Sequence, residues 1–217
     1  CGIIAAASNR NVGKLLVQGL HKMEYRGYDS AGIALHQTDQ IAHLRTLGKV
    51  KLLEEKMIAE KPKSKLGIAH TRWATHGEPS EENAHPHMSN ERVYIVHNGI
   101  IENYLDLKDF LKKEGYSFSS QTDSELIAHL LEYFLNKGNN MLDSMYLTKE
   151  KLDGAYAIAA IDKEDDQNII IARSKSPLLI GIGMDEFLAA SDPLAIGQLT
   201  NEFIFLEDGD VAELSSE

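Results

Sequence analysis

The feature that most constrains the fold is a series of short, almost entirely apolar segments separated by turn residues. The first, CGIIAAA at residues 1–7, is apolar throughout apart from the Cys1 thiol, as in a strand buried on both faces. Such strands need covering layers on both sides. The other predicted strands are Ala31–His36, Ile41–Leu47, Leu66–Thr71, Val93–His97, Tyr156–Ile161, Asn168–Arg173, Leu178–Ile182, Phe187–Ala190 and Phe203–Leu206.

Amphipathic segments between these strands supply the covering layers. Apolar residues recur at helical spacing over 12–23, after a possible N-cap at Asn11. A second helix is indicated over 52–57, before Pro62, and a capping-box pattern at Thr122–Glu125 predicts the start of a third. Antiparallel-looking strands with interspersed helices favour a layered α+β fold over a doubly wound parallel sheet.

Cys1 is the only cysteine, and it carries a thiol and an α-amine on one residue. Because translation does not begin on cysteine, we expect that a preceding residue has been removed. The unperturbed thiol pKa is about 8.5 and that of an α-amine roughly 7.7–8.0, so the amine can take the thiol proton. The alternative is an ordinary N-terminus trimmed before a small residue. The arrangement makes Cys1 a candidate nucleophile.

Three polar segments contain candidate partners for Cys1. They are YRGYDS at 25–30, HTRWATHG at 70–77 and HNG at 97–99. Arg72 is suited to hold a carboxylate through two parallel hydrogen bonds, or it is a surface arginine. The Asn98 amide and the next backbone N–H can both donate to an oxyanion, although Asn-Gly is also a common tight turn. Gly27 by itself indicates only an unusual loop conformation.

Four motifs occur together in order: CGII at 1–4, EYRGYDSAG at 24–32, HTRWATHG at 70–77 and VHNGIIEN at 96–103. Over essentially the whole chain the sequence resembles the glutaminase domains of class II glutamine amidotransferases, whose nucleophile is an N-terminal cysteine. Within that class it is similar to the glucosamine-6-phosphate synthase family, because of Tyr28–Ser30 and Trp73–Gly77. The alternative is another class II family such as the amidophosphoribosyltransferases.

The resemblance implies a four-layer αββα sandwich spanning residues 1–217 and hydrolysis of L-glutamine to glutamate and ammonia through a Cys1 thioester. It implies no cofactor. A sugar isomerase domain that receives the ammonia in the synthase family is absent from these residues, so we expect an excised or truncated domain, or a stand-alone ammonia donor. The full-length enzyme is expected to be a homo-oligomer.

The resemblance also implies roles for individual residues. Asn98 and Gly99 would form the oxyanion hole, Arg72 would hold the glutamine α-carboxylate, and Asp123 would hold its α-ammonium group. Asp123 is also interpreted as an acid in the first turn of its helix. The remaining assignments are Thr75, His76 and Gly77 as the wall of the glutamine pocket, Trp73 as a shield for departing ammonia, and Arg26 and Gly27 as supports of the N-terminus and the asparagine.

Two other function classes fit these residues less well. Histidines cluster around one loop (His70, His76, His85 and His87), but their spacing matches no familiar zinc motif, so we expect no metal. A binding domain that only retains the scaffold would be expected to lose Cys1, Asn98 or Arg72, and all three are present.

Charge and composition limit the partners. The formal net charge is -11, from 22 basic and 33 acidic residues, which disfavours nucleic acid and anionic membranes. No apolar run approaches the roughly 18–20 residues of a membrane span, and residues 1–7 do not resemble a secretory signal. A single cysteine gives no internal disulfide. We therefore expect a cytoplasmic protein.

Overall fold

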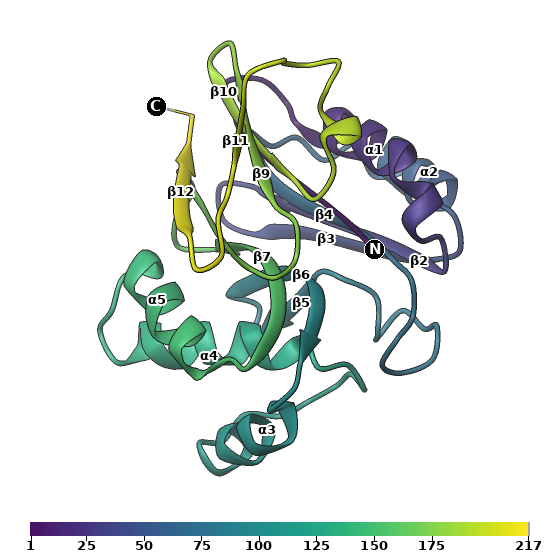
Figure 1. The fold of residues 1–217 in the computed structure, drawn as a ribbon. Helices are drawn as coiled ribbons and strands as arrows, with labels where there is room; N and C mark the ends of the chain where they lie inside the picture. The colour runs from purple at the N-terminus through teal and green to yellow at the C-terminus, as the bar shows by residue number, and fades with distance from the viewer. Residues whose placement is uncertain (217) are drawn as a thin grey trace.

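Two antiparallel sheets form the centre of the molecule (Figure 1). The computed structural model describes residues 1–216. The larger sheet has the strand order β11-β9-β10-β1-β4-β2-β3. Its strands are β1 (Gly2–Ser8), β2 (Ser30–His36), β3 (Ile41–Leu47), β4 (Leu66–Arg72), β9 (Leu179–Gly183), β10 (Glu186–Ala190) and β11 (Phe203–Phe205).

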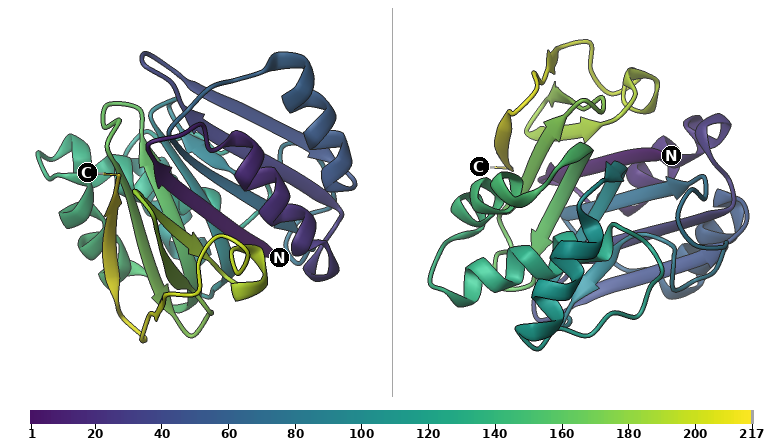
Figure 2. Two further views of the ribbon diagram at one scale, coloured as in Figure 1. Left: turned by 90° about the horizontal axis from the view of Figure 1, so that it is seen from above. Right: turned by 60° about the horizontal axis from the view of Figure 1, so that its bottom comes forward.

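The smaller sheet has the order β12-β8-β7-β6-β5. Its strands are β5 (His87–Ser89), β6 (Val93–Ile101), β7 (Gly154–Asp162), β8 (Asn168–Ser174) and β12 (Val211–Ser215). Helices α1 (Gly13–Lys22) and α2 (Val50–Glu60) cover the outer face of the larger sheet. Helices α3 (Tyr104–Lys113), α4 (Glu125–Asn136) and α5 (Met141–Lys151) pack on the smaller one. Figure 2 shows these helices on opposite sides of the two sheets.

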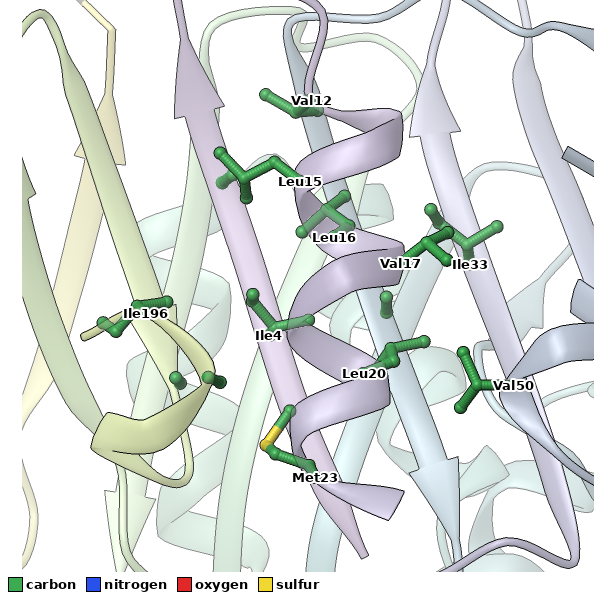
Figure 3. Close-up of a cluster of buried hydrophobic side chains, with 14 of the residues drawn as sticks. Ile4, Val12, Leu15, Leu16, Val17, Leu20, Met23, Ile33, Val50 and Ile196 are labelled. Atoms are coloured by element: carbon green, nitrogen blue, oxygen red, sulfur yellow. The ribbon is translucent and has the colours of Figure 1, made fainter. Parts of the chain in front are cut away.

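Three apolar clusters hold the four layers together. In the first, α1 lies along β1 and buries one face against the larger sheet (Figure 3). The third packs α3, α4 and α5 on the smaller sheet, and the second fills the space between the two sheets. Both faces of each sheet are therefore covered, as the apolar strands predicted. The α+β class and the αββα layering are confirmed.

The alternation of side chains along β1 decides where Cys1 points. Ile3, Ala5 and Ala7 belong to the cluster between the sheets, while Ile4 and Ala6 face α1. Successive side chains in a strand point to opposite faces, so residue 1 lies in the same row as Ile3. The Cys1 side chain is thus placed at the end of the layer between the sheets.

The same alternation carries polar residues into that layer from β4 and β6. Leu66 and Ile68 of β4 belong to the cluster between the sheets, so His70 continues their row. On β6, Tyr94 and Val96 belong to the same cluster, and Asn98 continues it. Polar residues from two sheets therefore meet at the end of the layer that also contains Cys1.

Several local predictions need correction. Helices α3 and α5 and strands β5 and β12 were not predicted. Asn11 is not the N-cap of α1, which is Val12; its Oδ1 accepts from Ser64 N at 3.1 Å and, more weakly, from Gly13 N at 3.4 Å. The capping-box interpretation of 122–125 is also wrong. Helix α4 begins at Glu125, whose carboxylate turns back to accept from the Ser119 and Ser120 amides.

The helices are short. None among residues 1–216 is both long enough and apolar enough to cross a membrane.

Candidate active site

Cys1 lies beside the end of β4. Gly2 pairs with Thr71 of β4, and the first residue after that strand approaches the thiol: Trp73 N–H donates to Cys1 Sγ at 3.2 Å. The Cys1 α-amine donates to the Arg26 carbonyl oxygen at 2.7 Å. Strand β1 is fixed just beyond it by Ser191, whose Oγ accepts from Ile3 N at 2.8 Å. The sulfur and nitrogen of Cys1 are thus both held in place.

The surroundings of the α-amine favour its neutral form. Its pKa is lowered from 8.0 to about 6: burial is the largest cause, the positive charge of Arg26 acts in the same direction, and the Asp29 carboxylate opposes both. Removing an ammonium group from water disfavours its charge. At neutral pH the amine is therefore mostly unprotonated and available as a base for the neighbouring thiol.

The segment 72–74 is held against the 26–29 turn. A Cβ on Gly27 would lie 2.7 Å from both Arg72 C and Trp73 N, so only glycine fits without moving that peptide. Asp29 N donates to the Arg72 carbonyl at 3.1 Å, and an Asp29 carboxylate oxygen accepts from Ala74 N. These contacts set the position of the Trp73 N–H that points at the thiol.

Arg72 is buried, with 4% of its surface exposed. Its guanidinium donates to three carbonyl oxygens of the following loop: Glu78 at 3.2 Å, Gly77 at 3.2 Å and His76. Desolvation lowers its pKa below the ordinary value of an arginine, while the Asp29 and Asp123 carboxylates oppose the shift. The guanidinium stays charged and fixes residues 76–78, which brings the loop over the end of the sheets.

Asp123 faces this loop from the smaller sheet's side. It is buried, and its Oδ2 accepts from Ile101 N at 2.7 Å. Its Oδ1 lies 3.9 Å from His76 Nδ1. Asp123 precedes α4 rather than lying in its first turn, so the interpretation as a first-turn acid is wrong. One carboxylate oxygen is committed to the backbone and the other faces the loop.

Asn98 and Gly99 lie near the end of β6. Asn98 Oδ1 is 2.9 Å from His70 Nε2. Gly99 has φ +120°, and a Cβ there would collide with the Ala155 carbonyl oxygen of the paired strand. Any other residue would be strained in this conformation and would push β6 away from β7. The Asn-Gly pair is therefore part of a strand and not the tight turn that the dipeptide alone suggested.

A cavity of about 30 Å³ joins most of these groups. Its lining comes from both sheets and the loop: Cys1, Arg72, Trp73, Thr75, His76, His85, His97, Gly99, Thr122, Asp123 and Ser124. That volume corresponds to a water molecule or two. Asn98, Arg26, Gly27 and Gly77 do not line it, but each contacts or adjoins a residue that does.

Trp73 lies on the rim. It is 55% exposed and makes an edge-on contact with Tyr28, with ring centroids 6.0 Å apart. A larger hollow of about 500 Å³ lies between α1 and α2, lined by residues such as Lys14, Met57 and Pro62. None of the predicted site residues lines it.

Buried histidines in and behind the cavity wall contact one another and their neighbours. The His70 and His85 rings stack at 3.9 Å, and His85 Nδ1 accepts from His97 N at 3.2 Å. Burial holds the pKa of His70 and of His85 well below 6.5 and lowers that of His87 to about 3. Within residues 1–216, no group of three or more His, Cys, Asp or Glu side chains is arranged to hold a metal ion.

Three residues of this region received no role from the sequence. Asp29 supports the 72–74 segment, and Asp192 accepts from Arg26 Nε at 2.8 Å. His70 was considered only as a metal ligand, yet it contacts Asn98. The alternation of β4 carried a usable signal for His70, because it lies two residues beyond Ile68 on the same face.

The fold and the site together define a class. The glutamine amidotransferase domain family matches residues 70–198, which is more than half of the chain. This chain belongs to that family.

Two relatives about half identical to this chain share one name. A protein from Haemophilus ducreyi called glutamine–fructose-6-phosphate aminotransferase [isomerizing] is 51% identical over 216 residues, covering 99% of this chain and 35% of that protein. One of the same name from Vibrio parahaemolyticus is 49% identical with the same coverage. The chain therefore spans about a third of the length of these relatives.

Solved structures confirm the fold. The glutamine phosphoribosylpyrophosphate amidotransferase of B. subtilis aligns with a TM-score of 0.79 and 24% identity, over 100% of this chain and 49% of that one. A structure described as the allosteric regulatory enzyme of purine biosynthesis aligns with a TM-score of 0.80 and 25% identity, with the same coverage.

Proposed function

We propose that this chain hydrolyses the side-chain amide of L-glutamine to glutamate and ammonia, with Cys1 as the nucleophile. The observation that carries the proposal is the half-buried Cys1 α-amine, which is held beside its own thiol by the Arg26 carbonyl at 2.7 Å and has a pKa lowered to about 6. Such an amine acts as a base at neutral pH. Family membership supplies glutamine as the substrate class.

In the proposed first half of the reaction, Cys1 Sγ forms a bond to the amide carbon and the carbonyl electrons move to its oxygen. The α-amine takes the thiol proton. The Asn98 Nδ2 group and the Gly99 N–H donate to the developing oxyanion. The C–N bond then breaks, the amine returns its proton to the leaving nitrogen, and ammonia departs from a thioester.

In the second half, water attacks the thioester carbon while the α-amine takes a water proton. The C–S bond breaks, the proton returns to the sulfur, and glutamate is released. Arg72 would pair with the substrate α-carboxylate, and Asp123 Oδ1 with its α-ammonium group. Thr75, His76 and Gly77 would enclose the side chain, and Trp73 would shield the departing ammonia. No step uses a metal or a cofactor.

Residues 1–217 form the glutaminase domain in this proposal, and the ammonia is consumed by a sugar isomerase domain elsewhere in a longer, homo-oligomeric cytoplasmic enzyme. There it would convert fructose 6-phosphate to glucosamine 6-phosphate. Relatives named for that substrate are 51% identical, against 24% for the structure of the phosphoribosylpyrophosphate enzyme. The sugar-phosphate acceptor is therefore favoured over the amidophosphoribosyltransferase alternative.

The test of the nucleophile uses ammonia release from L-glutamine and covalent labelling. We expect the chain to be active after treatment with chelators, and a glutamine-mimicking electrophile to modify Cys1 alone by mass mapping. Cys1→Ala should abolish both, and acetylation of the α-amine should abolish turnover. Full activity of either modified protein would refute the assignment. The acceptor is tested separately, by assaying the parent polypeptide with fructose 6-phosphate and with phosphoribosylpyrophosphate.

A further inference from the structure

We propose that His70 is a positioning residue for the amide hydrolysis: it holds the Asn98 carboxamide with Oδ1 inward, so that Nδ2 faces the reacting centre. The inference rests on the proposed function and deepens it. A carboxamide presents a donor or an acceptor depending on a half-turn about one bond, and only the donor stabilises an oxyanion. Something in the fold must therefore choose between the two orientations.

The contact that makes the choice crosses from one sheet to the other. His70 Nε2 on β4 and Asn98 Oδ1 on β6 are 2.9 Å apart. His70 is 1% exposed, and its ring is held in place by stacking on His85 at a centroid distance of 3.9 Å and an interplanar angle of 19°. The ring therefore has little freedom to follow Asn98 if the amide turns.

The charge state of His70 leaves two possible tautomers. Burial keeps the pKa of His70 well below 6.5, so the ring is neutral at neutral pH. A neutral imidazole has one N–H donor and one acceptor nitrogen. With the proton on Nε2, His70 donates to Asn98 Oδ1. With the proton on Nδ1, His70 Nε2 could only accept, and Asn98 would have to turn its NH₂ group inward.

The environment of His70 Nδ1 decides between the two tautomers of the ring. That atom is buried and has no hydrogen-bond partner among residues 1–216. A buried N–H without an acceptor is rarer in proteins than an acceptor without a donor. The proton is therefore placed on Nε2, which fixes Asn98 Oδ1 toward His70.

Asn98 is left with its amide group free. No hydrogen bond to a residue within 1–216 occupies Asn98 Nδ2, and Asn98 is only partly buried. Its neighbours His97 and Gly99 line the cavity that contains Cys1. The free donor is thus on the strand segment that borders the nucleophile.

The test compares two substitutions of His70 by glutaminase kinetics. His70→Phe keeps a flat ring against His85 but removes the donor, and we expect kcat to fall about 10-fold to 10²-fold with KM for glutamine changed less than about 3-fold. The fall is smaller than the 10²–10³ produced by deleting an oxyanion donor, because Asn98 is still present. His70→Gln restores an N–H near the Nε2 position and should recover most of kcat.

The matched control is His36→Phe. His36 is a buried histidine in β2, and within residues 1–216 its side chain makes one hydrogen bond, Nε2 to the Lys163 carbonyl at 2.8 Å. It follows Ala34 in the row that faces the other sheet, at the opposite end of the layer. We expect this variant to lose stability as His70→Phe does and to keep its kcat.

A double-mutant cycle separates positioning from general damage. In an Asn98→Ala background, His70→Phe should lower kcat by less than about 2-fold, because there is no amide left to orient. Equal losses in both backgrounds would overturn the proposal. So would an unchanged kcat for His70→Phe when the unsubstituted chain is active. An inactive unsubstituted chain would instead refute the proposed function.

A readout independent of activity is the ¹⁵N NMR spectrum of the imidazole ring, assigned by comparison with His70→Gln. We expect the neutral form of His70 with its proton on Nε2 from pH 6 to 8. A proton on Nδ1, or a cationic ring, would overturn the proposal even if the chain were inactive.

Discussion

The two ends of the layer between the sheets are built from the same strands, but one end is apolar and the other is polar. At one end β4 and β6 contribute Leu66, Ile68 and Val96, which are 3% exposed or less and belong to one apolar cluster. At the other end the same strands contribute His70 and Asn98, which are joined by a hydrogen bond. A change of two residues along each strand is enough to turn a packed core into a reactive site.

The apolar end gains stability from burial alone, whereas each polar group at the other end needs a partner. Arg72 has three carbonyl acceptors, Asp123 has the Ile101 amide, and the Cys1 amine has the Arg26 carbonyl. Buried polar groups without partners cost about 1–3 kcal/mol each. The site therefore tolerates less substitution than the core, because each change there leaves a buried polar group without its hydrogen-bond partner.

Asn98→Ala, a change at the polar end of the layer, is expected to have the largest effect on activity. Losing one oxyanion donor should lower kcat 10²- to 10³-fold, or about 2.7–4 kcal/mol, because the interaction forms only as charge develops. KM should change little. Steady-state kinetics with L-glutamine measure both, and a pure KM effect would contradict the assigned role.

Arg72→Lys should have the next largest effect. Lysine replaces a planar fork by a point charge and loses contacts to the 76–78 loop. We expect KM for glutamine to rise about 10-fold to 10²-fold, which is about 1.4–2.8 kcal/mol. Turnover of 4-aminobutanamide, which lacks the α-carboxylate, should change far less. Equal losses of activity on both substrates would mean that Arg72 only holds the 76–78 loop and does not bind the substrate carboxylate.

Activity should also fall in acid. The Cys1 amine has a pKa of about 6, so below that pH it is protonated and cannot take the thiol proton. We expect kcat/KM to fall about tenfold per pH unit below 6, that is by about 1.4 kcal/mol per unit, and to level off above 7. A profile from pH 4.5 to 8 measures this. A midpoint near 8 would indicate an unperturbed amine.

The acid limb needs a stability control, because burial lowers the pKa of His43 to about 4 and that of His87 to about 3. In the unfolded chain these rings take up protons near pH 6.5, whereas in the folded chain they stay neutral. The free energy of unfolding therefore declines as the pH falls below about 6.5. Circular dichroism at each pH shows whether the chain is still folded where activity is lost.

The smallest effect is expected at the apolar end. Ile68→Val removes one buried methylene group two residues from His70 and should lower the free energy of unfolding by about 0.5–1.5 kcal/mol. Urea unfolding measures this loss, and kcat at saturating glutamine should stay unchanged. A fall in kcat would mean that the two ends of the layer are not independent.

The sequence predicted the layers well because their signal is local. Uninterrupted apolar runs such as residues 1–7 require cover on both faces, and the helix over 12–23 supplies it. Helices α3 and α5 were missed, as were the short strands β5 and β12. The start of α4 was misplaced because the Glu125 carboxylate binds the Ser119 and Ser120 amides and leaves the Thr122 backbone alone.

The site was predictable in its members and less so in its contacts. Motif resemblance pointed to Cys1, Arg72 and Asp123, which the structure brings to one cavity. That Arg72 holds its own loop, and that Asp29 supports the peptide facing the thiol, depend on pairings between distant segments. No local pattern in the sequence encodes such contacts, so their roles as catalytic or binding groups stay predictions for the experiments above.

The acceptor for the N-terminal nitrogen is a main-chain oxygen, that of residue 26, so no side-chain replacement at that position can delete it. An alanine scan would pass over this contact and report only the loss of the ion pair with Asp192. The sensitive position is the neighbouring glycine, where an added methyl group would displace the turn that carries the oxygen. The chemistry of the first residue therefore depends on the backbone path of a turn some 25 positions away. Effects of substitutions in that turn report on how the main chain moves as well as on the side chain that is replaced.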